Sequence, residues 1–136
     1  MQYGYFDNEK REYVIDNVAL PYSWTNYLGV EDMAAVINHT AGGYLFYKTP
    51  EYHRISRFRG NGVPMDRPGF YVYIRDNEKK DYHSISWQPV AKDLSKAKYR
   101  CRHGLSYTVY ESEYDGLASS QTMVIPRGEN VLLWDV

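Results

Sequence analysis

The chain has 136 residues, a mass of 16.0 kDa and a formal net charge of −1 at pH 7. With 43% hydrophobic and 24% charged residues, its composition is that of a globular domain, not of a disordered chain, and its length fits one domain over residues 1–136. The near-zero charge argues against a strong electrostatic grip on nucleic acid or on an anionic membrane, and no apolar run approaches the ~20 residues that span a bilayer.

Targeting and redox features are sparse. The start, from Met1 to Tyr5, lacks the basic segment followed by an apolar stretch that marks a secretory signal. Cys101 is the single cysteine, so an internal disulfide is impossible and a cytoplasmic location is favoured. We therefore expect neither a membrane nor a nucleic acid among the partners.

The amino-terminal half predicts two β-hairpins, because turn-forming residues separate short segments rich in Tyr, Val, Ile and Phe. The hairpins join residues 5–6 to 13–15 across Asn8–Arg11, and residues 35–38 to 44–47 across Gly42-Gly43. Helix signals are weak in this half. One turn fits at Thr49-Pro50-Glu51, whereas 31–35 run straight into the second hairpin and are interpreted as loop followed by strand.

Period-2 alternation predicts two further hairpins in the second half. Apolar Phe70, Val72 and Ile74 alternate with the residues between them, as in a half-buried strand. The remaining predicted features are a charged loop at 76–81, a return strand at 82–87, one face shared by Leu105, Tyr107 and Val109, a tight turn at Asp115-Gly116, a return strand at 117–125 and a last strand at 130–136. The sequence thus predicts an all-β chain.

Tyrosine dominates the aromatic residues, with 15 Tyr against 4 Phe and 3 Trp. A tyrosine ring packs well on a pleated sheet and its hydroxyl tolerates water, so the preferred interpretation is a sheet with one half-wet face. The alternative is a face for sugars or for another protein.

Residues that could carry chemistry are dispersed. The four histidines show no spacing typical of metal ligands, so they are interpreted as surface or hairpin residues, and no metal site is expected. Cys101 lies between Arg100 and Arg102 without a neighbouring base, which favours a buried or inert thiol over a nucleophile. Asp7, Asp66, Asp76 and Asp115 lie in predicted turns, where hydrogen bonds to backbone explain them. No catalytic residue is assigned.

Three residues are candidates for binding. Arg57 and Arg59 point to the same side of any strand there and could hold an anion or an acidic partner, although a solvated strand face is the simpler interpretation. Trp87, like Trp24, could stack on a sugar, although large rings in a small β domain are more often part of the core.

Several strings resemble the amino-terminal start of the cellobiose phosphorylase family, the inverting glycoside phosphorylases of glycoside hydrolase family 94. They occur in family order: Tyr3-Gly4-Tyr5-Phe6-Asp7, Arg11-Glu12-Tyr13-Val14-Ile15, Trp24-Thr25-Asn26-Tyr27-Leu28-Gly29, Gly42-Gly43-Tyr44-Leu45-Phe46-Tyr47-Lys48, Val63-Pro64-Met65-Asp66-Arg67-Pro68-Gly69, Trp87-Gln88-Pro89-Val90, Arg102-His103-Gly104-Leu105-Ser106-Tyr107 and Val124-Ile125-Pro126-Arg127-Gly128-Glu129-Asn130. At 57–62 the sequence departs from the family, since Gly60 and Gly62 stand where the family commonly has Tyr and Asn.

The resemblance implies an antiparallel super-sandwich, galactose-mutarotase-like, of which residues 1–136 form an incomplete amino-terminal half. Family members cleave β-linked saccharides with inorganic phosphate and give an α-sugar 1-phosphate with inversion. Phosphate is a co-substrate of the parent enzyme, and no cofactor is expected. The family's general acid and its phosphate-binding residues lie in a helical barrel that has no counterpart here.

The resulting hypothesis is a scaffolding and subunit-contact piece of a cellobiose- or cellodextrin-phosphorylase-like enzyme, inactive alone. The expected partners are the remaining domains of such an enzyme or a second copy of the chain, in a homo-oligomer. A second hypothesis is a free-standing carbohydrate-binding module for a β-gluco-oligosaccharide. A third is an assembly domain without a ligand. The substrate among cellobiose, cellodextrin, chitobiose, laminaribiose and cellobionate is left open.

Overall fold

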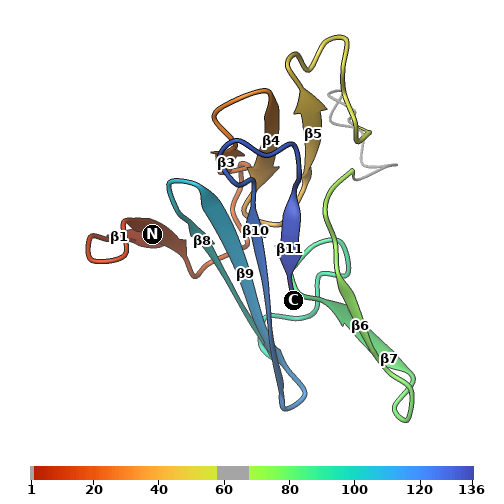
Figure 1. Ribbon diagram of the computed structural model, residues 1–136. Coiled ribbons are helices and arrows are strands. Elements are labelled where there is room, and N and C mark those ends of the chain that lie inside the picture. The colour runs from red at the N-terminus through yellow and green to blue at the C-terminus, as the bar shows by residue number, and fades with distance from the viewer. Residues whose placement is uncertain (1, 58–67) are drawn as a thin grey trace.

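A computed structural model describes residues 2–57 and 68–136 of the chain, and in this part it is built of strands without a helix (Figure 1). The strands are β1 (Gly4–Asp7), β2 (Glu12–Ile15), β3 (Thr25–Leu28), β4 (Met33–Asn38), β5 (Gly43–Tyr47), β6 (Tyr73–Asp76), β7 (Asp81–Ser84), β8 (Ala97–His103), β9 (Tyr107–Tyr114), β10 (Leu117–Val124) and β11 (Leu133–Asp135). The predicted all-β class is confirmed, and the sheets form a sandwich-like arrangement.

Three antiparallel sheets contain these strands. The largest has the order β1-β2-β8-β9-β10-β11, a second has β3-β4-β5, and a third is the β6–β7 hairpin. Most neighbours are consecutive in the chain, but β2 pairs with β8, with Ile15 opposite Cys101. The intervening segment builds the other two sheets before the chain returns to the first one.

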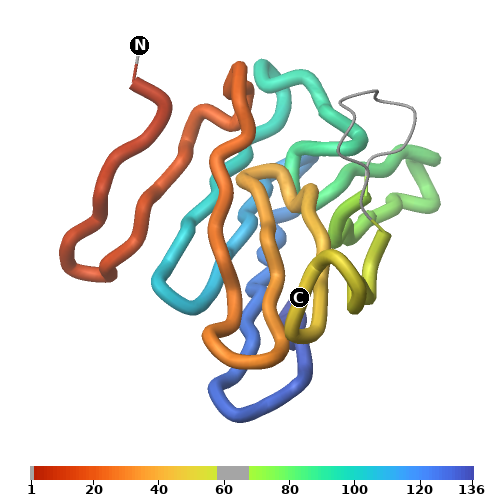
Figure 2. The backbone as a smooth tube through the Cα atoms, turned by 90° about the horizontal axis from the view of Figure 1, so that it is seen from above, coloured from red at the N-terminus to blue at the C-terminus, as the bar shows by residue number. Residues whose placement is uncertain are grey.

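The core lies between the six-stranded sheet and the β3–β5 sheet. In Figure 2, β3 and β4 lie in front of the strands of the large sheet. Ile15 and Tyr110 from the large sheet are buried in one cluster with Leu28 and Ile37 from the small one. A smaller cluster, centred on Val18 and Tyr99, continues the core toward Ala97 at the start of β8. Alternation along each strand therefore assigns one face to the core and leaves the other outside.

Buried side chains also form hydrogen bonds between the two layers. Asn26 Nδ2 on β3 donates to the carbonyl oxygen of Gly104 at 2.9 Å and to Thr108 Oγ1 at 3.1 Å. The Tyr110 hydroxyl on β9 donates to the Asn38 carbonyl at 2.7 Å. These bonds fix how the small sheet is placed on the large one.

All four predicted hairpins are present. The turn at Asp115-Gly116 has positive φ at both residues, 52° and 82°, as a type I′ turn requires. The amino-terminal hairpin, the Gly42-Gly43 hairpin and β6–β7 join the expected segments. Strands 70–75 and 82–87 are shorter than predicted, since only 73–76 and 81–84 pair. The single turn after Thr49 is confirmed by the His53 N–H bond to the Thr49 carbonyl at 3.0 Å.

Other expectations are corrected. Leu105 does not share the face of Val109, because it lies in the β8–β9 turn, where its side chain is 78% exposed while Val109 is buried. The sequence analysis also missed β3 and β8. In β8 the residues alternate regularly, with Ala97, Tyr99 and Cys101 buried.

The outer edge of β11 leads to the first prediction. Leu133 and Trp134 are 46% and 42% exposed, and β11 is the last strand of its sheet, so its outer backbone groups have no ladder partner among the described residues. We expect the edge to pair with a second copy, because its open backbone groups and the exposed Leu133 and Trp134 side chains can template another chain. Light scattering at about 100 μM should show a dimer or higher oligomer.

Leu133→Lys places a charge at this edge and should shift the population toward monomer. Leu105→Lys, at a residue 78% exposed in the β8–β9 turn, should leave it unchanged. A monomer with the natural sequence would refute the expectation.

Candidate functional site

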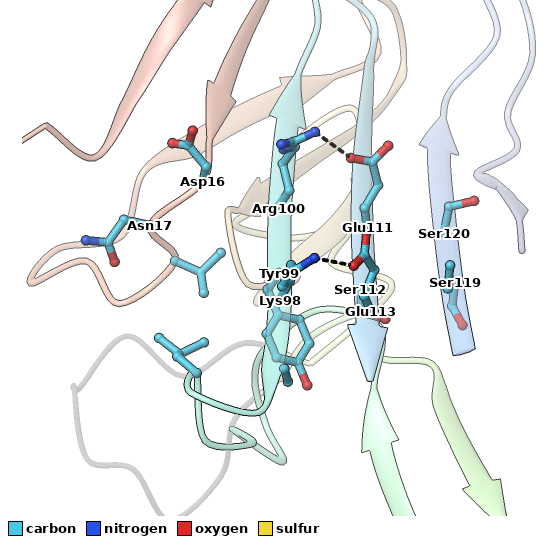
Figure 3. A pocket seen from close by; sticks show the side chains of 14 residues that line it. Asp16, Asn17, Lys98, Tyr99, Arg100, Glu111, Ser112, Glu113, Ser119 and Ser120 are labelled. Atoms are coloured by element: carbon cyan, nitrogen blue, oxygen red, sulfur yellow. Dashed lines mark hydrogen bonds and ion pairs between the residues drawn. The ribbon is translucent and has the colours of Figure 1, made fainter. Parts of the chain in front are cut away.

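A hollow of about 670 Å³ lies along β8, β9 and β10. Figure 3 shows Lys98 and Arg100 on β8 reaching toward the acidic side chains of the neighbouring β9. Lys98 Nζ lies 2.8 Å from Glu113 Oε2, and an Arg100 amino nitrogen lies 4.0 Å from Glu111 Oε2. Because each cation already faces a carboxylate, the hollow offers a mixed polar surface in place of a net charge for an anionic ligand.

A buried ionic network continues the same sheet face. Arg102 donates to both carboxylate oxygens of Glu12, at 2.9 and 3.1 Å, and to Glu111 Oε1 at 3.0 Å. The Tyr107 hydroxyl donates to Glu12 Oε1 at 2.5 Å, and this bond raises the pKa of Tyr107. The Glu12 side chain is only 1% exposed. A carboxylate so buried requires its partners, so the network joins β2, β8 and β9.

His39 and His83 are buried and His103 is half-buried, so a surface position is wrong for these three, whereas the expected hairpin position holds for each of them. His39 and His83 are 5% and 4% exposed. His39 Nδ1 accepts the Trp24 N–H at 3.2 Å, and its Nε2 donates to the Val18 carbonyl at 3.1 Å. The partners are backbone groups distant in sequence, so spacing alone did not reveal them. Only His53 is exposed as expected.

His103 completes this arrangement at the other side of Trp24. Its Nε2 donates to the Trp24 carbonyl at 3.3 Å, and its Nδ1 accepts from the Thr108 hydroxyl at 3.1 Å. Burial lowers the pKa of His103 to about 4, and burial also lowers the pKa of His39. Both rings are therefore neutral near pH 7 and act as connectors between the layers.

Cys101 is confirmed as a buried thiol. Its exposure is 0%, and burial raises its pKa well above the ordinary value. The sulfur lies 3.7 Å from the His103 ring nitrogens, but those nitrogens are already occupied by other partners. A thiol without solvent access or thiolate character is a poor nucleophile.

A third polar cluster ties the β6–β7 hairpin to the large sheet. Lys92 Nζ lies 2.5 Å from Asp81 Oδ1, and the Tyr114 hydroxyl donates to Asp81 Oδ2 at 2.6 Å. These bonds hold the pKa of the Asp81 carboxyl below its usual range. Asp76 bonds to turn backbone, at Glu78 and Lys79, as predicted.

The structure places two of the three predicted binding residues, and their binding role stays a prediction. Arg57 is exposed in the segment after β5, and Arg59, like Asp66, lies outside the described residues. Trp87 packs against the Val18 cluster, and its indole N–H donates to the Lys92 carbonyl at 3.0 Å. Trp24 likewise packs against the main core. The core interpretation of both rings agrees with these contacts.

A second hollow, of about 760 Å³, was missed by the sequence analysis. It lies beside the rings of Phe6, Tyr13 and Trp24. The ring centroids are 4.7 Å apart for Phe6 and Tyr13, and 5.2 Å apart for Tyr13 and Trp24. Asp7 and Arg11 also line it. Its signal in the sequence is the alternation that places Phe6 and Tyr13 opposite each other, and therefore on the same face, in the first hairpin.

Among residues 2–57 and 68–136, no three His, Cys, Asp or Glu side chains gather in a way that could hold a metal ion. In the same residues, nothing helical is long and apolar enough to cross a membrane. The polar clusters of this part join strands, and most of their charged groups face one another, as those of Glu12, Arg102 and Glu111 do.

Comparison with known proteins identifies relatives. The supersandwich domain of glycosyl hydrolase 94 matches residues 11–136. Over all 136 residues the chain is 54% identical to N,N'-diacetylchitobiose phosphorylase of Vibrio proteolyticus and 53% identical to that of Vibrio furnissii, covering 17% of each protein. Solabiose phosphorylase of Paenibacillus borealis is 30% identical over 142 aligned positions, which cover 98% of the chain and 17% of that protein. The chain thus spans about 17% of the length of these relatives.

The ionic network yields the second prediction. Replacing Arg102 by Met should destabilise the fold by about 3 kcal/mol, because the buried Glu12 carboxylate loses its charged partner. Arg100→Met, at an exposed pair, should cost less than about 1 kcal/mol. Urea unfolding of both variants measures the difference. Equal losses would show that Glu12 does not depend on Arg102.

The neutral His103 yields the third prediction. Its pKa is about 4 in the folded chain against the ordinary 6.5, so between these values the unfolded state binds more protons and stability falls as the pH falls. The loss from His103 should approach about 3 kcal/mol by pH 4. It is measured as the free energy of unfolding from pH 7 downward.

His103→Gln should flatten this pH dependence, whatever its effect on stability at pH 7. His53→Gln, at the exposed histidine, is the matched control and should leave the slope unchanged. An undiminished slope in His103→Gln would assign the acid sensitivity to other groups.

Proposed function

Since the chain belongs to the supersandwich domain family of glycosyl hydrolase 94, we propose that it serves as the supersandwich part of a glycoside phosphorylase. The parent reaction would be the phosphate-dependent cleavage of a β-linked disaccharide, with an α-sugar 1-phosphate as product. The observation that carries this proposal is the 54% identity to a phosphorylase over every position of the chain.

For the substrate, the relatives favour an amino sugar over the cellobiose or cellodextrin expected from the sequence strings. The two relatives above 50% identity are N,N'-diacetylchitobiose phosphorylases, whereas those near 30% act on other glycosides by name. We therefore place N,N'-diacetylchitobiose first. None of these four relatives is named a cellobiose phosphorylase.

The role of the chain itself would be scaffolding and subunit contact. Its buried ionic groups, such as Glu12 and Arg102, are paired with one another in a network that joins strands, and Cys101 is buried. Phosphorolysis needs a general acid and a phosphate-binding group positioned at a reacting bond. Contact with a second copy, with the remaining domains, and a cytoplasmic location all stay predictions.

The fourth prediction separates the chain from its parent. Supplied with N,N'-diacetylchitobiose and phosphate, the 136-residue chain should form no N-acetylglucosamine 1-phosphate. The Vibrio proteolyticus enzyme should stay active when its aligned segment is replaced by this chain, with kcat/KM within roughly tenfold of the natural enzyme. A coupled assay for the sugar phosphate measures both.

Cellobiose is the control substrate for the chimera and should be turned over far more slowly. An inactive but folded chimera would argue against the scaffolding role. The proposal that the chain is inactive alone would be refuted by a different result. This result is turnover by the isolated chain that survives repurification and disappears when one of its acidic residues is substituted.

A further inference from the structure

The outer face of the β3–β5 sheet carries a row of side chains that the core does not use. Leu28, opposite Ala35, points into the core, so the residues on either side of them point outward. Tyr27 pairs with Val36, and Val36 pairs with Tyr44, which places these three outward residues in one row across the strands. Tyr27 is 67% exposed.

A hollow of about 590 Å³ lies over this row. Neighbouring strands are about 4.8 Å apart, so the Cα atoms of Tyr27 and Tyr44 are separated by about 10 Å. In Figure 2 this sheet lies in front of the six-stranded sheet. The hollow, named here the tyrosine hollow, has a volume typical of small-molecule sites.

The lining of the tyrosine hollow combines apolar surface with uncharged polar groups. Besides the row it includes Thr25, Asn38, Tyr71 and Gln88, and none of the described residues that line it is acidic or basic. The hollows along β8 and beside Phe6 both include charged residues. A neutral lining disfavours phosphates and other anions, which proteins hold with Arg or Lys.

The Tyr44 end of the row is held in place before any ligand arrives. The Tyr44 ring lies 5.9 Å from the Phe46 ring and 6.0 Å from the Arg54 guanidinium carbon. Asn38 Oδ1 accepts the N–H groups of Thr40 at 2.9 Å and Gly42 at 2.8 Å, which fixes the floor beside the row. A preordered surface loses little entropy when a ligand binds.

Two hydroxyl groups are available at the same surface. Those of Tyr27 and Thr25 have no hydrogen-bond partner among the described residues. An aromatic ring offers an apolar face to the C–H groups of a sugar, and hydroxyls with open valences match the sugar's own donors and acceptors. These groups suit a neutral ligand that is apolar on one face and hydroxylated around its rim.

We propose that the tyrosine hollow binds a neutral, β-linked oligosaccharide, with Tyr27 and Tyr44 stacking on two of its sugars. In an extended β-1,4-linked chain alternate sugars present the same face, at a spacing similar to that of the two tyrosines. A trisaccharide should therefore bind better than a disaccharide. The choice of N-acetylated sugars within this class rests on the proposed function.

Nuclear magnetic resonance of the 15N-labelled 136-residue chain tests the site. Titration with N,N',N''-triacetylchitotriose, without phosphate, should shift the amides of β3, β4 and β5, with a dissociation constant on the order of 1 mM. N,N'-diacetylchitobiose should bind more weakly. Cellotriose is the comparison for sugar type, and inorganic phosphate alone should cause no shift in this sheet.

Variants at the exposed ring separate stacking from general effects. Tyr27→Ala should weaken binding roughly tenfold, and Tyr27→Phe, which keeps the ring, should stay within about threefold. Tyr52→Ala is the matched control, because Tyr52 is 75% exposed and does not line the hollow. Thr25→Val gives a second test of the site that leaves both rings in place, and it should weaken binding about threefold.

Absence of shifts in β3–β5 at saturating trisaccharide would overturn the proposal. Shifts confined to the residues around Phe6 and Trp24 would also overturn it, as would equal affinities of Tyr27→Ala and Tyr52→Ala. Equal binding of cellotriose and the chitotriose would uphold the site and remove only the preference for N-acetylated sugars. None of these readings depends on turnover, so they stand apart from the chimera assay that tests the phosphorylase role.

Discussion

The hydrogen bonds that cross between the two main sheets are the constraint on which the rest of the structure depends. Asn26 reaches from β3 to the carbonyl of Gly104, and Tyr110 reaches from β9 to the carbonyl of Asn38. A similar bond ties the large sheet to the segment before β6, since Gln121, fully buried, donates to the Phe70 carbonyl at 3.0 Å. A buried polar group without its partner costs about 1–3 kcal/mol. Apolar packing alone would tolerate small slips between the layers, whereas these bonds accept only one placement.

The same constraint explains why histidine and cysteine side chains, which often take part in catalysis, make structural contacts here. His39 and His103 both contact the backbone of Trp24, one at its N–H and the other at its carbonyl. Cys101 lies behind them with no exposure. Their polar atoms are used to hold the layers, so the surfaces left for recognition are the outward faces of the sheets. On the large sheet that face is occupied by paired charges, whereas on the small one it is mainly aromatic, with Arg54 beside the Tyr44 ring.

Local signals predicted the hairpins, and non-local contacts decided what the sequence could not show. The Asp115-Gly116 turn is specified by two adjacent residues. By contrast, β2 pairs with β8 across most of the chain, and no pattern in either segment names its partner. The alternation of apolar and charged residues from Ala97 to Cys101 could have predicted strand β8, although the sequence analysis considered this segment only for its thiol. The resemblance strings identified the family, while the sugar could not be chosen from them. The stacking row of Tyr27 and Tyr44 became visible only when the strand register placed the two rings in line.

The pairing of β2 with β8 also has a consequence for synthesis in the cell. A ribosome adds about 5–20 residues per second, so roughly 4–17 s pass between the emergence of Ile15 and that of Cys101, its partner in the ladder. During this interval β3, β4 and β5, whose backbone ladders pair only with one another, can already form a sheet. The apolar side of that nascent sheet, with Leu28 and Ile37, stays uncovered until the later strands arrive. The order of synthesis therefore creates a period in which this segment is exposed to association with other chains or to capture by chaperones.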